Sequence, residues 1–311
     1  MRVPAPSLST RGFKAWMLRV RAPFLTAAIL PIVVGSVAAW ARTRVFHVGY
    51  FLLTLIGGTL MQAGANMVND YFDHLSGADR LNREAVVPFT GGSPVLKLGL
   101  LSPERVRNEA ITYFVIAGLI GLYLTFTRSV WVLALGVAGV AAGCLYTTFF
   151  APWGLGELAL FLSFGPLMVL GGWITQTGSP AWEPLWASLP LGFLILNVLW
   201  INQFPDAVAD GAVGKRHWVV RLGRRRAVLL YGLFFLATYL SLVVAVLLGA
   251  LPVWTLLALL PGPLAWRAYR VARRHYDEPP RLAPANALTV QVHLLTGLFL
   301  IVGYLIQGLV W

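Results

Sequence analysis

The amino-acid sequence predicts an all-α, polytopic membrane protein, and three observations support this fold class. Hydrophobic residues make up 58% of the 311 residues and charged residues only 12%, with a mean hydropathy of +0.73. A soluble globular domain carries about 25% charged residues, so we expect lipid to surround much of this chain. The apolar residues also fall into long runs, and the basic residues gather between alternate runs.

Nine runs are apolar and long enough to cross a bilayer as helices, which takes about 17–25 residues. They lie at about 23–41, 50–68, 109–126, 130–149, 156–174, 185–202, 228–248, 252–267 and 288–309. The single cysteine, Cys144, lies within the fourth run and has no partner in the chain for a disulfide. The sequence therefore predicts nine transmembrane helices without a covalent cross-link.

The basic residues predict the orientation of these helices. If the N-terminus is cytoplasmic and the runs alternate in direction, all 24 Lys and Arg residues except Arg42, Arg44 and Arg128 fall on the cytoplasmic side. Cytoplasmic loops of membrane proteins carry an excess of Lys and Arg, so this orientation is expected. Two cytoplasmic loops are then long, at about 69–108 and 203–227, and residues 1–311 form a single domain.

A first group of polar residues lies at the predicted cytoplasmic end of the second run. Asn66, Asn69, Asp70 and Asp73 follow one another at helical spacing. Offsets of three, four and seven residues place side chains on one side of a helix. We therefore expect one polar helix face at this membrane boundary.

A second group lies at the corresponding end of the sixth run. Asn202, Asp206 and Asp210 are spaced four residues apart, again on one helix face. Pro205 lies inside this group and removes one intrahelical hydrogen bond, which predicts a kink or an opening of the helix. Two matched groups after even-numbered helices suggest two related halves of the fold.

The residue types in both groups suit a cation and a phosphorylated substrate. Carboxylate and amide oxygens are ligands that Mg²⁺ prefers, and Mg²⁺ commonly also binds substrate phosphates. Basic residues close to the groups, and the turn at residues 91–93, would complete a diphosphate site. These basic residues are Arg80, Arg83, Lys215, Arg216 and Arg221. The alternative for any single Asp is a helix cap or a solvated charge at the membrane boundary.

Other classes of protein fit these features less well. A transporter would place polar groups near the membrane midplane, reachable from both sides, whereas these charges gather at one face. A phosphatidyl-type alcohol transferase needs a Gly after the second Asp, and His74 follows Asp73. The net charge of +12 does not indicate nucleic-acid binding, because the basic residues border apolar runs. Glu157, near the start of the fifth run, is expected to be a first-turn acid with a structural role.

Four segments together resemble the UbiA superfamily of intramembrane prenyltransferases. They are Arg21–Ser36, the first polar group within 66–79, the second within 204–223, and the Gly-Glu start of the fifth helix within 154–171. The Asn-x-x-Asn-Asp-Tyr-Phe-Asp form and the Gly-Lys-Arg stretch are most similar to the menaquinone branch. This resemblance implies helices arranged around a central cavity that opens to the cytoplasm.

The resemblance also implies an activity and a set of partners. It implies Mg²⁺-dependent transfer of a polyprenyl group from a polyprenyl diphosphate to an aromatic acceptor, with 1,4-dihydroxy-2-naphthoate expected. A 4-hydroxybenzoate-like acceptor and terpene cyclisation on the same fold stay open. The implied location is the plasma membrane of a prokaryotic cell, with the active site facing the cytoplasm.

The implied site residues are carried over onto matching positions of this chain. The catalytic aspartates would be Asp70, Asp73, Asp206 and Asp210. The metal ligands would be Asn66, Asp70, Asp73, Asn202, Asp206 and Asp210, with each polar face holding one Mg²⁺. The substrate-binding residues would be Asn66, Asn69, Arg80, Lys215, Arg216, Arg21 and Tyr146.

Overall fold

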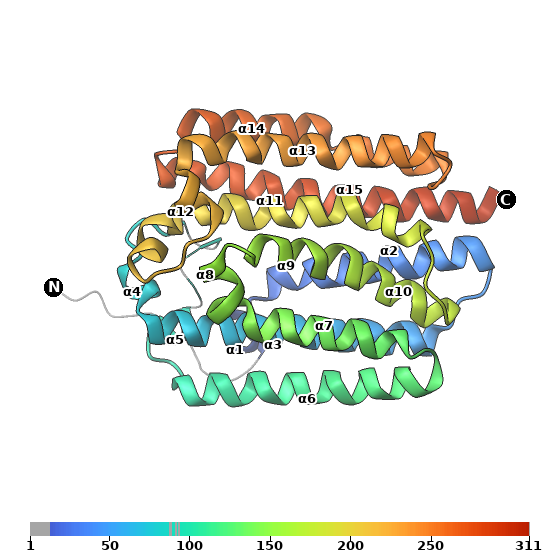
Figure 1. Cartoon of the computed structure of the whole chain (residues 1–311), viewed down its shortest axis with the longest axis horizontal. Helices are drawn as coiled ribbons and strands as arrows, with labels where there is room; N and C mark the ends of the chain where they lie inside the picture. Colours follow the sequence, from blue (N-terminus) through green and yellow to red (C-terminus); the bar gives the residue numbers. More distant parts are fainter. Residues whose placement is uncertain (1–12, 87–88, 91, 93, 311) are drawn as a thin grey trace.

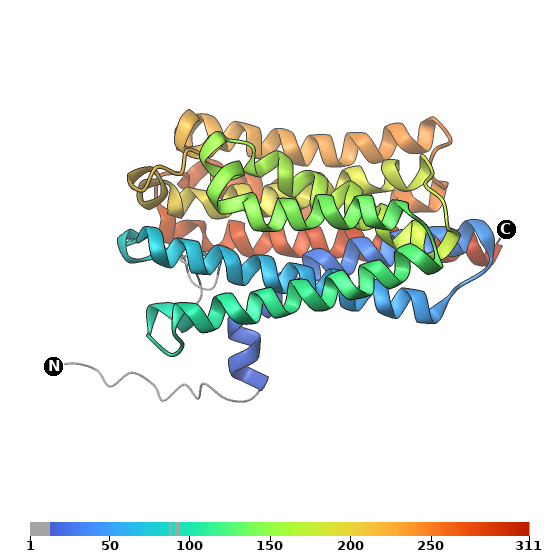
Figure 2. The same cartoon turned by 60° about the horizontal axis from the view of Figure 1, so that its bottom comes forward.

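The computed structural model describes residues 13–86, 89–90, 92 and 94–310. Throughout these residues the regular structure is helical, as the sequence predicts. The long helices run side by side along one axis in both cartoon views, and shorter helices gather at one end (Figures 1 and 2).

The helices of the first half are α1 (Phe13–Arg19), η1 (Ala22–Leu25), α2 (Thr26–Thr43), α3 (Val48–Ser76), α4 (Ala78–Leu81), α5 (Pro94–Lys97), α6 (Pro103–Thr127), α7 (Trp131–Leu145), η2 (Tyr146–Phe150) and α8 (Ala151–Trp153). Those of the second half are α9 (Gly156–Leu162), η3 (Ser163–Leu167), α10 (Met168–Thr177), α11 (Glu183–Ala212), α12 (Trp218–Leu222), α13 (Arg224–Leu247), η4 (Val253–Leu259), α14 (Gly262–His275), η5 (Pro279–Leu282) and α15 (Ala283–Val310).

Eight helical segments in the described part of the chain are long and apolar enough to cross a membrane. They are 22–43, 48–76, 103–127, 131–153, 156–177, 183–212, 224–247 and 279–310. Each coincides with one of the predicted runs, so the protein is an integral membrane protein. The segment 131–153 joins α7 to α8 through η2, and the segment 156–177 joins α9 to α10 through η3.

The remaining predicted run, at about 252–267, is not one continuous apolar helix. It is divided between the 3₁₀-helix η4 and the α-helix α14. Pro261 and Pro263 explain the division, because proline lacks a backbone N–H and disfavours helix in the residue before it. The segment still returns along the bundle, since α15 packs against both η4 and α14, and α13 also packs against α14 (Figure 1).

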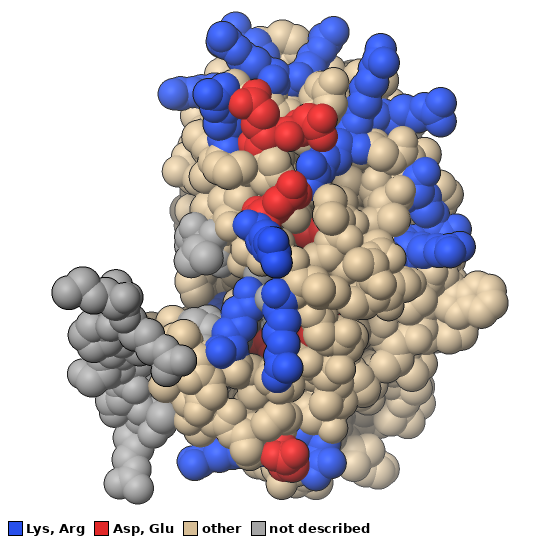
Figure 3. Space-filling model, turned by 90° about the vertical axis from the view of Figure 1, so that its left-hand side faces the viewer, with Lys and Arg blue, Asp and Glu red and all other residues tan. Residues whose placement is uncertain are grey.

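Two helices extend past the ends of the predicted runs and carry the polar groups. Helix α3 continues to Ser76 and α11 continues to Ala212, so the aspartates of both groups lie on the last turns of long helices. Helix α11 is uninterrupted at Pro205, where we expected a kink or an opening. Both ends lie beside α4 and α12 in Figure 1, and Figure 3 shows many Lys and Arg side chains over this end of the bundle.

Helices α2 and α10 pack with their backbones almost in contact. A Cβ atom added at Gly172 would lie 2.3 Å from the carbonyl oxygen of Ile32, and one added at Gly35 would lie 2.0 Å from that of Val169. The Ser36 hydroxyl donates a hydrogen bond of 3.3 Å to the Gly172 carbonyl oxygen across the same contact. Small residues allow membrane helices to approach this closely, and here they bring two helices of the central bundle together.

The close contact predicts that Gly172→Ala destabilises the protein, because its methyl group would meet the Ile32 carbonyl. Overpacking of this kind costs about 1–3 kcal/mol. The neighbouring Gly171 provides a matched control, since an added Cβ there meets nothing within 4 Å. Thermal unfolding in detergent should therefore show a lower midpoint for Gly172→Ala and an unchanged or higher one for Gly171→Ala. Equal midpoints for Gly172→Ala and the wild type would contradict the close contact.

Candidate active site

A cavity of about 740 Å³ extends into the bundle from the end that carries α4 and α12. Its walls include residues of α3 from Leu53 to Asp73, a stretch of about 30 Å at 1.5 Å per helical residue. Asp73, Asp206, Asp210 and Lys215 lie at one end of it, and most of the other lining residues are apolar or glycine. The cavity is therefore an apolar channel that is charged at one end.

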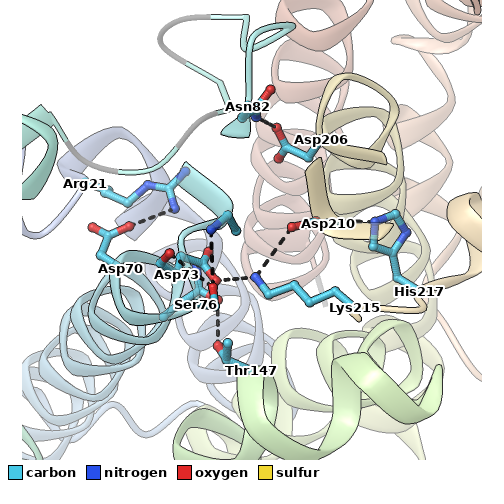
Figure 4. Close-up of polar contacts among 12 residues, drawn as sticks. Arg21, Asp70, Asp73, Ser76, Asn82, Thr147, Asp206, Asp210, Lys215 and His217 are labelled. Atoms are coloured by element: carbon cyan, nitrogen blue, oxygen red, sulfur yellow. Dashed lines mark hydrogen bonds and ion pairs between the residues drawn. The ribbon is translucent and has the colours of Figure 1, made fainter. Parts of the chain in front are cut away.

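The first polar group provides Asn69 and Asp73 to this cavity. Figure 4 shows Asp73 beside Lys215. The Asn69 side-chain N–H donates to Asp73 at 3.0 Å, and the Thr147 hydroxyl donates to the Asn69 side-chain oxygen at 2.8 Å. Thr147 lies in the π-helical turn η2, so η2 holds the Asn69 side chain in place. Asp73 is thereby oriented by its own helix and by a neighbouring one.

Lys215 connects the two polar groups. Its ammonium donates a hydrogen bond to Asp73 of α3 and lies 3.7 Å from a carboxylate oxygen of Asp210 of α11. Burial alone lowers the pKa of Lys215, but the Asp73 and Asp210 carboxylates more than offset this and hold it above its ordinary value of 10.5. The charge on Lys215 therefore stabilises the folded state while these carboxylates are ionised, and that contribution is lost as the pH rises through the raised pKa.

The second polar group also faces the cavity, and each member has a partner from another segment. The Asn82 side chain donates to Asp206 at 2.5 Å, and the Asn286 side chain donates to Asn202 at 2.7 Å. Nε2 of His217 lies 3.3 Å from the second carboxylate oxygen of Asp210. Figure 4 shows Asp206 and Asp210 on one side of the cavity mouth and Asp73 on the other.

Asp70 lies outside the cavity that Asn69 and Asp73 line, whereas Asn66 lines it but is hydrogen-bonded to another segment. Asp70 is buried, is absent from the lining of the main cavity and lies 3.7 Å from the Arg21 guanidinium. Asn66 lines the cavity, but its amide donates at 2.9 Å to the carbonyl oxygen of Val20. Successive helical residues are about 100° apart, so the adjacent Asn69 and Asp70 point in different directions. The first predicted face is in fact two neighbouring stripes.

The other sequence-predicted site residues are divided between the cavity and the surface. Arg21 and Tyr146 line the cavity, whereas the side chains of Arg80 and Arg216 are exposed and are not among its lining residues. Residues 91 and 93 of the predicted anion-binding turn lie outside the described residues. Within the described residues, no three Asp, Glu, His or Cys side chains come together as a ready-made metal cage.

Sequence reasoning missed several residues that orient the site. They are Asn82, Thr147, His217 and Asn286, which contact Asp206, Asn69, Asp210 and Asn202 respectively. Each comes from a segment distant in sequence from its partner, except His217, and none shares the helical spacing of the two polar groups. The Gly-Lys-Arg stretch at 214–216 was a sequence signal for His217, which follows it directly.

Glu157 holds the loop that carries Lys215 against the start of α9. Its carboxylate is buried and accepts hydrogen bonds from the Gln203 side chain at 3.1 Å and the Trp218 backbone N–H at 2.9 Å. The Trp218 indole N–H donates to the Gly154 carbonyl oxygen at 2.8 Å. The first-turn acid predicted to have a structural role therefore connects α9, α11 and the loop after α11.

The charges at the cavity mouth favour a bound cation. Asp73, Asp206 and Asp210 face two basic side chains there, Lys215 and Arg21, and Arg21 also faces Asp70. The ammonium of Lys215 already lies between two carboxylates. Carboxylate and amide oxygens converge on the same region, and these are the donors that Mg²⁺ takes. The site can thus hold a cation together with an anionic head group, while the channel accepts an apolar chain.

Comparisons of this chain with family models and with known proteins agree on one family. A model of the UbiA prenyltransferase family matches residues 28–295. The chain is 29% identical over 310 residues to the 2-carboxy-1,4-naphthoquinone phytyltransferase of Synechocystis sp., covering 98% of this chain and 97% of that protein. It is 34% identical over 262 residues to the 1,4-dihydroxy-2-naphthoate octaprenyltransferase of Mycobacterium tuberculosis, covering 83% and 85%.

The solved structures give the same fold. The structure of a UbiA homologue from Archaeoglobus fulgidus bound to DMAPP and Mg²⁺ matches with a TM-score of 0.69 at 15% identity, covering 95% of this chain and 99% of that one. The resemblance inferred from the two polar groups and their flanking segments is confirmed. This chain belongs to the UbiA prenyltransferase family.

Proposed function

We propose that this protein transfers a polyprenyl group from a polyprenyl diphosphate to 1,4-dihydroxy-2-naphthoate, in the biosynthesis of menaquinone. The observation that carries the proposal is the form of the cavity. Three aspartates, a lysine and an arginine line an otherwise largely apolar channel, charged at one end. A polyprenyl diphosphate has the same division, with a highly charged head and a long hydrocarbon chain.

The donor set at the mouth fits Mg²⁺. Asp73 on α3 and Asp206 and Asp210 on α11 would hold it, with the side-chain oxygens of Asn69 and Asn202 nearby. Mg²⁺ usually binds through one or two carboxylates and completes its shell with water and substrate phosphates, so no ready-made protein cage is required. When bound, it would supply Lewis-acid stabilisation of the diphosphate leaving group. The Archaeoglobus relative, which is bound to DMAPP and Mg²⁺, supports this assignment.

Side chains of the protein itself would stabilise the charge that develops. Breaking the allylic C–O bond leaves its electron pair on the diphosphate, and Lys215 lies where its ammonium can bind that negative charge. The apolar walls exclude water from the allylic carbon, which must meet the acceptor ring first. The Tyr146 ring lines the cavity and offers an aromatic face to a cation.

The acceptor assignment rests on the relatives. The names of the Synechocystis and Mycobacterium enzymes both describe a 1,4-oxygenated naphthalene ring that carries a carboxyl group. Arg21 is a cavity-lining cation that could bind such a carboxylate, because its pairing with Asp70 at 3.7 Å leaves other guanidinium donors. In this reaction the prenyl group replaces the carboxyl group, which leaves as CO₂.

The proposal includes the location and orientation. We place the protein in the plasma membrane of a prokaryotic cell, with its N-terminus and cavity mouth in the cytoplasm and residues 1–311 acting as one domain. The distribution of basic residues supports this orientation, because they gather at the cavity end of the bundle (Figure 3).

The first test is product analysis with purified protein. Incubation with a polyprenyl diphosphate, Mg²⁺ and 1,4-dihydroxy-2-naphthoate should give a prenylated, decarboxylated naphthalene product by mass spectrometry. EDTA should abolish the product, and excess Mg²⁺ should restore it. Product with 4-hydroxybenzoate alone would contradict the acceptor, and diphosphate release with a cyclised prenyl product and no acceptor would contradict the transfer reaction.

The cavity geometry predicts that single Asp variants differ in how much activity they lose. Asp73→Asn, Asp206→Asn and Asp210→Asn should each lower kcat by roughly 100- to 1,000-fold, as loss of one charge-stabilising group typically does. Asp70→Asn should cause a much smaller loss, because its carboxylate contacts Arg21 outside the main cavity. Steady-state kinetics on the four variants, with thermal unfolding as a folding control, tests this order. An Asp70→Asn defect equal to that of Asp73→Asn would refute it.

Glu157 is predicted to be a positioning residue for Lys215. Glu157→Ala removes the acceptor that holds Trp218 and should lower kcat/KM by roughly 10- to 100-fold, mainly through a higher KM for the prenyl diphosphate. Glu157→Gln keeps one acceptor oxygen and should restore part of the loss. Glu104→Ala, an exposed first-turn acid of α6, is the matched control. A lower unfolding temperature with an unchanged donor KM would mean that Glu157 acts on stability alone.

A further inference from the structure

Helix α14 has one face packed on the bundle and one face that is strongly basic. Its small residues Ala265, Ala268 and Ala272 are buried, and the Tyr269 ring packs against Gly232 of α13. The opposite face carries four exposed arginines, which are Arg267, Arg270, Arg273 and Arg274. None of these residues lines the active-site cavity.

Part of this basic face lies at the depth of the lipid-facing surface. Gly232, beside Tyr269, is eight residues after the first residue of α13, which corresponds to about 12 Å along the helix. Leu229 and Leu233 of α13 lie at the same depth, and each is 53% exposed. Arg267 and Arg270 lie within two residues of Tyr269 in the sequence, so they are level with these exposed apolar side chains.

The carboxylates nearest in sequence to the α14 arginines are already paired with other groups. Asp277 lies 3.4 Å from the Arg224 guanidinium, and Glu278 contacts Arg281 at 2.8 Å and His275 at 3.1 Å. Among the described residues, no carboxylate lies within ion-pair distance of the four α14 arginines. A charge at this depth normally has a partner, so the partner is expected to come from outside the chain.

We propose that the arginine face of α14 binds the phosphodiester head group of an anionic phospholipid. Arginine side chains extend along a helix toward the membrane boundary, where lipid phosphates lie, and their planar guanidinium groups bind phosphate with two hydrogen bonds. The face opens to the side of the bundle, which suits a lipid and not the diphosphate substrate.

The test measures lipid binding by the purified full-length protein. In native mass spectrometry, we expect phosphatidylglycerol to remain bound in preference to phosphatidylcholine. The double variant Arg267→Gln/Arg270→Gln should bind phosphatidylglycerol about 25-fold more weakly, at about fivefold per basic residue near an anionic surface. The matched control Arg105→Gln/Arg107→Gln removes two cations of α6 that contact Glu109 and Asn108 within the protein, and it should bind like the wild type.

Two further measurements keep the result decisive. Phosphatidylglycerol should raise the thermal unfolding midpoint of the wild type but not of the double variant. If the glutamine variant does not fold, the variant Arg267→Lys/Arg270→Lys is measured in its place, and it should retain most of the preference for phosphatidylglycerol. Inorganic phosphate at millimolar concentration should not displace the lipid. Equal binding of both lipids by the wild type, an unchanged preference in the double variant, or displacement by phosphate would overturn the proposal.

Discussion

Three carboxylates facing a largely apolar channel would repel one another unless a positive charge lay among them, and Lys215 provides that charge. Its ammonium joins Asp73 at the end of α3 to Asp210 at the end of α11, two helices that belong to different halves of the chain. Removing one partner of such a buried group leaves an uncompensated charge, so the ends of both helices and the loop between α11 and α12 depend on this contact.

Other residues at the cavity mouth hold the Lys215–Asp73 contact in place. Glu157 holds the backbone at Trp218, three residues after Lys215, and Thr147 holds Asn69, which in turn binds Asp73. Both supports come from the segment between α7 and α10, where π-helical turns interrupt the regular helix. Such turns often occur at functional sites, because one extra residue in a turn redirects neighbouring side chains.

Much of the fold could be predicted from the sequence, since apolar runs and basic loops report membrane helices directly. Hydropathy does not show that the run at 252–267 is divided between two helices, because it does not register the prolines within the run or the arginines that follow in α14. Helical spacing located both polar groups but did not separate Asn69 and Asp73 from Asp70, because neighbouring stripes differ only by rotation about the axis. Partners such as Asn82 and Asn286 depend on tertiary packing, which spacing does not report.

The net charge of +12 has three physical origins, which the structure separates. Many of the basic residues lie over the cavity end of the bundle, as expected for membrane orientation. Lys215 and Arg21 are instead turned inward toward carboxylates, where each positive charge is largely offset within the protein. Arg267 and Arg270 of α14 belong to neither group, since they are exposed at the depth of outward-facing leucines. In a chain with so few charges, the surroundings of each charge determine its role. The inward cations differ from the outward ones because they contact aspartates of the two polar groups.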